Sequence, residues 1–227
     1  MLRIGGFTPF TTTDYPGRLA AVVFCQGCPW RCAYCHNPHL LPADGPESHA
    51  WGDILAFLET RRGLLDAVVF SGGEATAQSG LGDAMRAAKA LGFRIGLHTA
   101  GMYPNRLALL LPLLDWVGLD VKAPRAAYAR IVGAPTDAAA VYASLRMIMD
   151  SAIEHEVRCT WHPRLLDEAD LRALVGDLRE VGADKLVLQE YRAAGAVTPL
   201  PDIVTADRAG LPELANGLRC LIHRAER

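Results

Sequence analysis

Several features that would point to a particular class of protein are missing from this sequence. The most apolar stretch, residues 107–119, is interrupted by Pro112 and Asp115 and is too short to cross a bilayer. The formal net charge of the 227 residues is only −2, so no basic field indicates nucleic-acid binding. No apolar segment with a cleavage site follows Arg3, so no secretion signal is expected. With 51% hydrophobic and 21% charged residues, the chain is predicted to be a globular cytoplasmic protein without membrane or nucleic-acid partners.

Two nucleotide-binding signatures are also absent. No G-x-G-x-x-G follows the first expected strand, which argues against a dinucleotide-binding Rossmann unit. The Gly72-Gly73-Glu74 segment lacks the Lys-Ser/Thr ending of a phosphate-binding P-loop. Lysine itself is scarce, with three residues against twenty arginines, which coding bias explains. The bias makes Lys122 slightly more informative, because it lies inside a motif.

The chain does contain a cluster of cysteines. Three of its six cysteines fall within eight residues, Cys28, Cys32 and Cys35, in the spacing C-x3-C-x2-C. Such clustering favours a metal site in a reducing cytosol over a disulfide framework. Thiolates suit both iron–sulfur clusters and zinc. Three ligands on a four-iron cluster would leave one iron open, whereas zinc would take a fourth ligand from Cys25 or His36.

The hydrophobic pattern predicts strands that alternate with helices. After a loop or short hairpin at residues 5–17, strands are expected at residues 19–26, 67–70, 93–98, 116–122, 157–162 and 185–191. Helices are expected at residues 51–62, 81–91, 105–114, 137–155 and 167–181, and the remainder as one helix and a short final segment. This order predicts βα units around a parallel sheet, in either an open doubly wound or a partial-barrel form. The motifs follow several different strands, which is typical of a barrel.

Strand alternation separates polar from apolar faces. In the strand at residues 116–122, Asp120 and Lys122 share a face opposite Val117, Leu119 and Val121. The strands at residues 94–98 and 157–162 divide similarly, with these residues on the more polar face: Gly96, His98, Arg158, Thr160 and His162. A barrel lumen lined this way would suit a polar ligand. The alternative is that Asp120 and Lys122 form a structural ion pair and nothing more.

The flanking segments carry a resemblance to a known family. The cysteine spacing with Tyr34 before the last cysteine resembles the signature of the radical S-adenosylmethionine (SAM) superfamily. DYPGRLAAVVFCQGC, CHNP, FSGGEAT, GLHTAGMYP and WVGLDVKAP resemble segments of glycyl-radical-enzyme activases, in particular those of anaerobic ribonucleoside-triphosphate reductase. The similarity covers about residues 5–192 in the same order.

The resemblance implies a fold and cofactors. The fold is a partial (β/α)6 TIM-like barrel formed by one domain of residues 1–227, with a core at 18–192, an N-terminal loop at 1–17 and a C-terminal tail at 193–227. The cofactors are SAM and a 4Fe-4S cluster held by Cys28, Cys32 and Cys35, with the open iron bound by SAM. A monovalent cation near Asp120 is a further cofactor of the resemblance. However, His98 stands where relatives often have Asp, and neutral histidine supplies no anionic oxygen ligand.

The resemblance also assigns residues to the SAM site. Lys122 would neutralise the SAM carboxylate and count, with the three cysteines, among the catalytic residues. The other SAM-site residues are Tyr34 near the adenine, Gly72, Gly73 and Glu74 at the amino group, and Thr99, Asp120 and His162. His162 would contact the ribose or sulfonium region, and a capped structural histidine is the equal alternative. Ala75 replaces the usual proline after the Gly-Gly-Glu motif, which removes a constraint on φ.

The remaining cysteines and the loop end are expected to be structural. Cys25, Cys159 and Cys220 are interpreted as packed residues. His36 and Asn37 follow the last cysteine and are expected to shape the surroundings of the cluster.

The implied function is reductive cleavage of SAM, followed by hydrogen abstraction by the 5′-deoxyadenosyl radical from a glycine of anaerobic ribonucleoside-triphosphate reductase. The implied partners are that reductase and a one-electron donor such as flavodoxin or ferredoxin. Three alternatives stay open: activation of another glycyl-radical enzyme, a radical reaction on a small molecule such as a deazapurine precursor, or a zinc- or cluster-bearing binding module.

Overall fold

The sheet is the framework of the molecule. The structure is a computed structural model that describes residues 2–204 and, for the backbone alone, 219–223. Eight strands form one sheet in the order β1 to β8. Their bounds are β1 Ile4–Thr11, β2 Ala20–Cys25, β3 Ala67–Gly72, β4 Arg94–Thr99, β5 Trp116–Asp120, β6 Glu154–Trp161, β7 Lys185–Glu190 and β8 Arg219–His223. Strands β2 to β8 are parallel neighbours, whereas β1 pairs antiparallel with β2.

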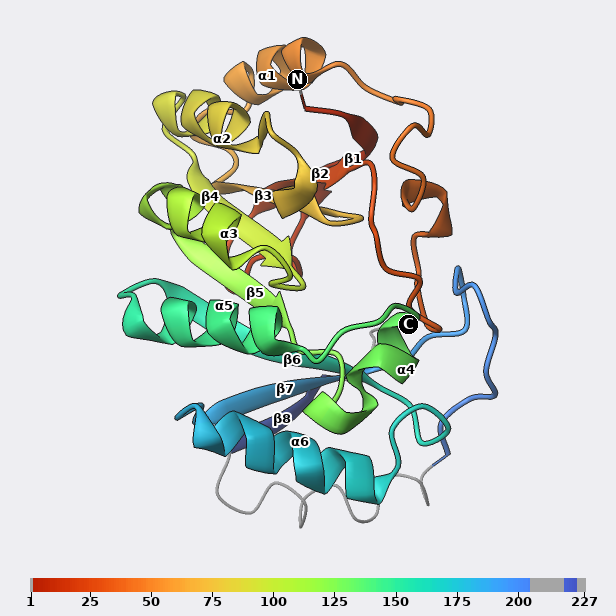
Figure 1. Cartoon of the computed structure of the whole chain (residues 1–227). Helices are drawn as coiled ribbons and strands as arrows, with labels where there is room; N and C mark the ends of the chain where they lie inside the picture. Colours follow the sequence, from red (N-terminus) through yellow and green to blue (C-terminus); the bar gives the residue numbers. More distant parts are fainter. Residues whose placement is uncertain (1, 205–218, 224–227) are drawn as a thin grey trace.

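Helices connect the parallel strands β2 to β7 and cover one face of the sheet (Figure 1). The α-helices are α1 Trp51–Glu59, α2 Leu81–Ala90, α3 Pro104–Leu110, α4 Tyr128–Val132, α5 Ala139–Asp150 and α6 Glu168–Glu180. Short 3₁₀ helices are η1 Pro38–Leu40, η2 Ala75–Ala77, η3 Leu111–Leu113 and η4 Arg125–Ala127. The α/β class and the partial TIM-like barrel are therefore confirmed, with β2 to β7 as the six expected strands.

Two expectations about the elements are corrected. Residues 5–17, expected to form a loop or short hairpin, contribute most of the strand β1 at the edge of the sheet. The short final segment expected in the C-terminal tail is the parallel strand β8 at the other edge, and the helix expected in the tail lies outside the described residues. The helix expected at residues 137–155 ends at Asp150, because the Ser151 backbone is extended and its hydroxyl donates to the Ile148 carbonyl at 2.6 Å. The chain then enters β6 at Glu154, which pairs with Trp116.

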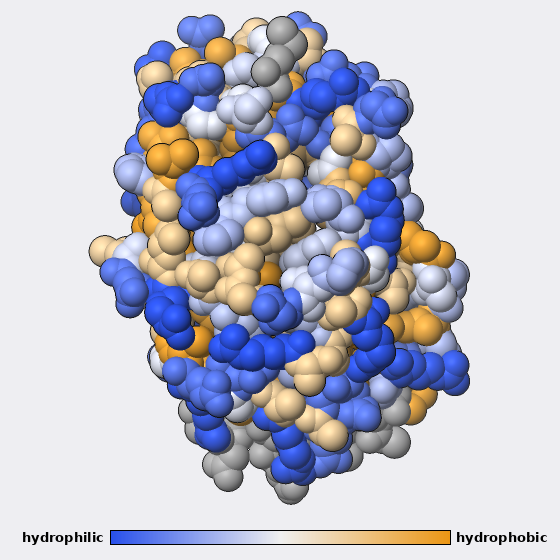
Figure 2. All heavy atoms as spheres, in the orientation of Figure 1, coloured by the Kyte–Doolittle hydropathy of each residue, from blue (hydrophilic) through white to orange (hydrophobic). Residues whose placement is uncertain are grey.

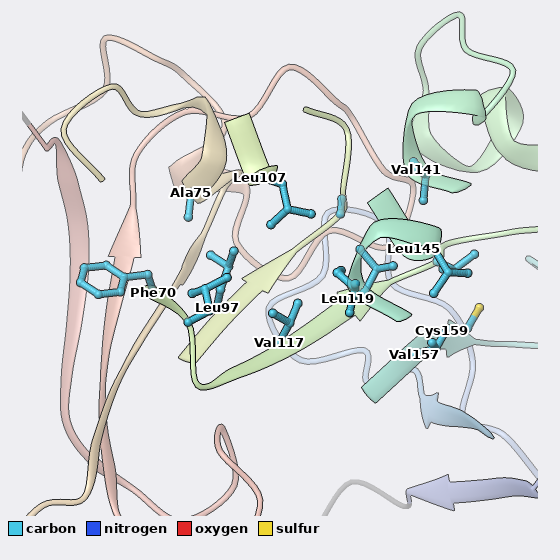
Figure 3. Close-up of a cluster of buried hydrophobic side chains, with 14 of the residues drawn as sticks. Phe70, Ala75, Leu97, Leu107, Val117, Leu119, Val141, Leu145, Val157 and Cys159 are labelled. Atoms are coloured by element: carbon cyan, nitrogen blue, oxygen red, sulfur yellow. The ribbon is translucent and has the colours of Figure 1, made fainter. Parts of the chain in front are cut away.

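Alternating residues of each strand form two separate apolar groups. The larger lies between the sheet and the helices, and Figure 3 shows side chains from β3, β4, β5, β6, α3 and α5 pointing toward one another there, among them Phe70, Leu97, Leu119, Leu145 and Val157. The smaller lies on the opposite face, which we call the lumen, and consists of Tyr15, Ala20, Val22, Ala67, Val69 and Trp116. This confirms the expected alternation: the strands bury an apolar face under the helices and turn the other face inward.

The lumen is closed at one end by aromatic side chains. Tyr15, in the connection between β1 and β2, is 1% exposed and packs on Trp116 with ring centroids 5.3 Å apart. Because Trp116 begins β5, this aromatic pair lies near the amino ends of the parallel strands. The residues that follow the carboxyl ends of the strands lie at the opposite end of the barrel.

The face of the molecule drawn in Figure 2 has a surface of mixed polarity. Figure 2 shows strongly apolar side chains in small separate groups among charged ones on this face. No helix in the described ranges is both long enough and apolar enough to span a membrane.

Candidate functional site

The three clustered cysteines lie on one loop that begins directly after β2. Cys28, Cys32 and Cys35 are partly exposed, whereas Cys25, the last residue of β2, is fully buried. Cys159 is buried on the helix side of β6, as expected. The side chain of Cys220 lies outside the described residues. Among the described cysteines, only the three loop thiols therefore combine partial exposure with a common position after the carboxyl end of β2.

The cysteine loop, residues 26–37, is held from two sides by backbone hydrogen bonds. Gly27 N and Cys28 N donate to the carbonyls of Leu40 and Leu41, at 2.8 and 3.1 Å. On the other side, Arg31 N donates to Val132 O at 2.9 Å, and Ala33 N donates to Ile131 O at 3.2 Å. The loop is thus fixed between the η1 segment and α4.

Gly133 makes the contact with α4 feasible. It ends α4 in the left-handed region, with φ of 62°. A Cβ atom at this position would lie 2.6 Å from the Arg31 carbonyl oxygen. Glycine therefore satisfies both the backbone conformation and the close approach of the loop.

The chemistry of the donor set fits a thiolate-bound metal cluster. Three thiols on a short loop match the ligands that iron–sulfur clusters take. Burial raises the pKa of Cys28 to about 11, so its thiol is protonated at neutral pH and a metal would have to displace that proton. Within the described residues, no three Cys, His, Asp or Glu side chains converge closely enough to hold a metal ion. The thiols would consequently have to turn toward a common centre on binding.

Lys122 brings a positive charge beside this loop. Its ammonium nitrogen lies 5.7 Å from the centre of the Tyr34 ring and 3.6 Å from Asp120 Oδ2. Burial alone would lower the pKa of Lys122, but neighbouring Tyr34, Asp120 and Cys32 raise it well above its ordinary value. Lys122 is therefore a permanent cation next to the loop, as a group that neutralises a ligand carboxylate must be.

Tyr34 has an orphaned polar atom at the same place. The side chain is 5% exposed, and its hydroxyl has no hydrogen-bond partner among the described residues. Burial raises the pKa of Tyr34 well above its ordinary value, so the hydroxyl remains a neutral donor. A buried donor without a partner is costly unless a bound group accepts from it. This observation fits a ligand beside Tyr34 and Lys122.

Asp120 is held by two cations. Arg158 donates from Nε to Asp120 Oδ1 at 3.0 Å, and Arg158 Nη2 lies 2.9 Å from the same oxygen, while Lys122 approaches Oδ2. Burial alone would raise the pKa of Asp120, but Arg158, Lys122 and His98 lower it. Asp120 is therefore a carboxylate that positions Lys122, which agrees with the structural ion pair given as the alternative. The negative charge of Asp120 is already neutralised by the two cations.

These residues do not fit a monovalent cation. His98 donates from Nε2 to the Asp14 carbonyl at 2.8 Å, and its Nδ1 lies 3.5 Å from Ser71 Oγ. Burial and the adjacent Arg158 lower the pKa of His98 to about 4, so the ring is neutral at pH 7. A neutral imidazole and a carboxylate with two protein cations leave no net negative charge to attract a further cation.

The glycines of the Gly-Gly-Glu motif serve the base of the cysteine loop. A Cβ atom on Gly72, where φ is 113°, would lie 2.3 Å from Cys25 N. On Gly73 it would lie 2.4 Å from the Gly27 carbonyl oxygen. Gly73 N donates to Cys25 O, and Glu74 N donates to Gly27 O, both at 2.9 Å. The close approach predicted for these glycines is therefore made to the chain that leads into the cysteines.

The Glu74 side chain braces the neighbouring loops. It is 1% exposed, and its Oε1 accepts hydrogen bonds from Thr76 N, Thr76 Oγ1 and Thr99 Oγ1, at 3.1, 2.5 and 2.7 Å. Its Oε2 accepts from Ala100 N at 2.9 Å. Thr99, the predicted neighbour of the SAM site, is thus tied to Glu74, and the carboxylate is satisfied within the protein.

His162 has both ring nitrogens engaged. Its Nε2 donates to the Pro201 carbonyl at 2.9 Å, and its Nδ1 accepts from Arg164 N at 3.0 Å. Because a carbonyl only accepts and a backbone amide only donates, the ring is the neutral tautomer protonated at Nε2. With 1% of the residue exposed, this geometry favours the structural alternative for His162.

Three residues of the site have a larger part than the sequence patterns indicated. Arg158 was placed on the polar strand face, but its partner Asp120 required the register of β5 and β6. Tyr128 lies in η4–α4, a segment without a prediction, and its hydroxyl accepts from Lys122 N at 3.2 Å. Tyr191 packs against both His36 and His162. Of these three residues, only Arg158 carries a signal in the sequence, because it is a charged residue within an expected strand.

The chain is similar to several known proteins. A family model described as the radical SAM superfamily matches residues 22–184. MJ1227 of Methanocaldococcus jannaschii, described as a glycyl-radical enzyme activating enzyme, is 27% identical over 213 residues, covering 85% of this chain and 81% of MJ1227. The pyruvate formate-lyase-activating enzyme of Clostridium pasteurianum is 34% identical over 127 residues, but the match covers 54% of this chain and 53% of that enzyme.

Solved structures share the fold. The crystal structure of QueE from Escherichia coli superimposes with a TM-score of 0.59 at 20% identity, covering 98% of this chain and 93% of QueE. At this identity the likeness concerns the fold alone.

Proposed function

The chain belongs to the radical SAM superfamily, and from this premise we propose that it is an activase that generates a glycyl radical on a partner enzyme. The observation that carries the proposal is the similarity to a glycyl-radical enzyme activating enzyme over 85% of the chain. The partner proposed is anaerobic ribonucleoside-triphosphate reductase, because the segments around the cysteines, the Gly-Gly-Glu motif and Lys122 resemble those of its activases.

The proposed cofactors are a 4Fe-4S cluster and SAM. Cys28, Cys32 and Cys35 would hold the cluster, and Lys122 would pair with the SAM carboxylate beside it. When bound, the two together supply one-electron cleavage of SAM and a 5′-deoxyadenosyl radical that takes hydrogen from glycine.

The residues of the chain provide binding, orientation and exclusion of water. Asp120 and Arg158 hold Lys122 toward the cysteine loop through the 3.6 Å and 2.9 Å contacts. Tyr34 offers a buried hydroxyl with no partner in the described part of the chain, next to the Lys122 ammonium. Tyr15 and Trp116 are buried and pack together at the far end of the lumen, so the cysteine-loop end is proposed as the entry for a substrate. This arrangement favours a segment of a large partner presented from that end.

The test is the glycyl radical itself. The protein is reconstituted with iron and sulfide under anaerobic conditions, reduced chemically, and mixed with SAM and a candidate reductase. We expect a glycyl doublet in the electron paramagnetic resonance spectrum and release of 5′-deoxyadenosine. The matched controls are the Cys32→Ala variant and a reductase in which the target glycine is alanine. If SAM is cleaved but no glycyl radical forms on the reductase, the proposed partner is wrong and the superfamily assignment stands.

A second candidate partner has its own support. The relative from Clostridium pasteurianum is a pyruvate formate-lyase-activating enzyme and is 34% identical over the matched region. The same experiment with pyruvate formate-lyase as the acceptor separates the two partners. A reaction on a small molecule would instead show SAM cleavage that depends on the small molecule and on no protein acceptor. A one-electron donor such as flavodoxin or ferredoxin is proposed to replace the chemical reductant in the cell.

A further inference from the structure

A segment outside the family match lies along the cysteine loop. We call residues 192–201 the strap; they follow β7, whereas the family model ends at residue 184. In Figure 1 the strap and the cysteine loop occupy the same side of the molecule. Val197 N donates to Cys35 O at 3.0 Å, and His36 Nε2 donates to the Arg192 carbonyl at 2.8 Å. The strap is therefore bonded directly to the last cysteine of the loop and to its neighbour.

Tyr191 fastens the strap. Its hydroxyl donates to Thr198 O at 2.8 Å and accepts from Leu200 N at 3.2 Å, so both of its hydrogen-bonding functions are used by the strap. The residue is 7% exposed, and its own backbone N donates to Trp161 O at 2.9 Å at the end of β6. Tyr191 thus joins a fixed position on the sheet to the middle of the strap.

The Tyr191 ring also lies between two histidines. Its centroid is 5.6 Å from that of His36 on the cysteine loop and 5.4 Å from that of His162 after β6. Each histidine in turn donates to a strap carbonyl, His36 to Arg192 and His162 to Pro201. The start, middle and end of the strap are therefore held by three rings, and the Tyr191 ring contacts each of the two histidines.

The strap is only partly anchored by apolar packing. Ala193, Ala196 and Leu200 are partly buried against the core, whereas the other strap residues are exposed and Val197 is 51% exposed. Gly195 has φ of 79°, which lets the chain turn beside the His36 carbonyl. Because no strap residue is fully buried, the hydrogen bonds from the three rings contribute strongly to the position of the strap.

We propose that Tyr191 is a positioning residue that fastens the strap against the cysteine loop and thereby fixes the backbone of Cys35 and His36. The Cys35 carbonyl is bonded to the strap, so release of the strap frees the end of the loop that carries the third thiol. That the third thiol is a cluster ligand rests on the proposed function, whereas the restraint of the loop by the strap does not.

The experiment begins with the metal-free protein, where the proposed function has no influence. Alkylation of each cysteine by iodoacetamide is followed by mass spectrometry under anaerobic, native conditions. Tyr191→Phe keeps the ring contacts and removes both hydroxyl hydrogen bonds. We expect it to speed alkylation of Cys35 by about tenfold, which corresponds to about 1.4 kcal/mol. Alkylation of the fully buried Cys25 should not change.

The matched control is Tyr142→Phe. It removes a buried tyrosine hydroxyl that donates to Asp177 Oδ2 at 3.2 Å between α5 and α6, away from the strap. A rate for Cys35 that is equal in the two variants would overturn the proposal. The proposal would also be overturned if Tyr191→Phe accelerated the alkylation of all cysteines equally, since that would indicate general destabilisation.

A second pair of variants tests the link from the strap to His36. Gln at position 36 can donate an amide hydrogen from a position close to imidazole Nε2, whereas Ala cannot. We expect Cys35 to be alkylated as slowly in His36→Gln as in the wild type, and faster in His36→Ala. In the reconstituted proteins, the visible absorbance of the cluster should also decay faster in air for Tyr191→Phe than for Tyr142→Phe. A thiol effect without any glycyl radical would sustain this inference and reject the proposed function.

Discussion

Arg158 and Asp120 are paired residues of neighbouring parallel strands, and their side chains meet on the lumen face. The backbone register aligns them, and Arg158 contacts one carboxylate oxygen through a hydrogen bond from Nε and an ion pair from Nη2. The other oxygen is left to Lys122 at 3.6 Å. One buried arginine therefore decides how Lys122, the cation beside the cysteine loop, is oriented.

Lys122→Met should weaken SAM binding without preventing cluster assembly. The side chain keeps its apolar stem but loses the charge, and a charge-assisted hydrogen bond contributes about 1.5–3 kcal/mol, so the dissociation constant should rise roughly 10- to 100-fold. Titration calorimetry on the reconstituted protein gives the affinity, and iron analysis gives the cluster content. Lys185→Met is the control, because Lys185 pairs with Glu156 near the amino ends of the strands. Unchanged SAM affinity in Lys122→Met would exclude the proposed role.

Cys32→Ala should abolish cluster binding, whereas Cys25→Ala should retain it. Both changes remove one sulfur atom, but Cys25 is fully buried in β2 and Cys32 lies on the loop. Burial raises the pKa of Cys25 far above its ordinary value, so it stays a thiol. Iron and sulfide content with the visible absorbance spectrum distinguishes the variants. Equal loss of iron in the two would show that the ligand assignment is wrong.

Gly133→Ala should destabilise the protein more than Gly63→Ala. Both glycines have positive φ, 62° and 76°, so each alanine costs about 1–2 kcal/mol for the left-handed conformation. At Gly133 the new Cβ would also lie 2.6 Å from the Arg31 carbonyl oxygen, whereas nothing lies within 4 Å at Gly63. We expect an additional loss of about 1–3 kcal/mol from that clash, measured by urea unfolding. Similar unfolding midpoints for the two variants would mean that the loop yields freely at Arg31.

His98→Gln should flatten the dependence of stability on pH between about 6.5 and 4. The folded state lowers the pKa of His98 to about 4 because of burial and Arg158, while the unfolded chain keeps a value near 6.5. As the pH falls through this range, the unfolded state binds a proton that the folded state does not, so wild-type stability declines. Gln cannot titrate and can still donate to the Asp14 carbonyl.

The control for this pH effect is His39→Gln, because the His39 side chain is exposed on η1. Unfolding by urea at a series of pH values should show the wild-type slope in His39→Gln and a shallower slope in His98→Gln. A slope that persists in His98→Gln would place the titrating group elsewhere.

The sequence by itself determined the local features. Runs of apolar and β-branched residues located the six central strands, because such runs are visible in the sequence itself. Alternation along the strands separated Asp120 and Arg158 from the residues that face the helices, and cysteine spacing grouped the three loop thiols. The predicted end of the helix at residues 137–155 was wrong, because α5 ends before Ser151, whose extended backbone is not encoded by residue propensity.

The tertiary structure alone decided which distant residues meet. The strap touches Cys35 and His36 although it lies about 160 residues further along the chain, and no local period relates the two segments. The same holds for the glycines of the Gly-Gly-Glu motif, whose missing side chains make room for the backbone of Cys25 and Gly27. Such contacts arise from the order and register of the strands, which bring their carboxyl ends to one side of the sheet. Residue types and spacing therefore supplied the chemistry, and the sheet supplied its arrangement in space.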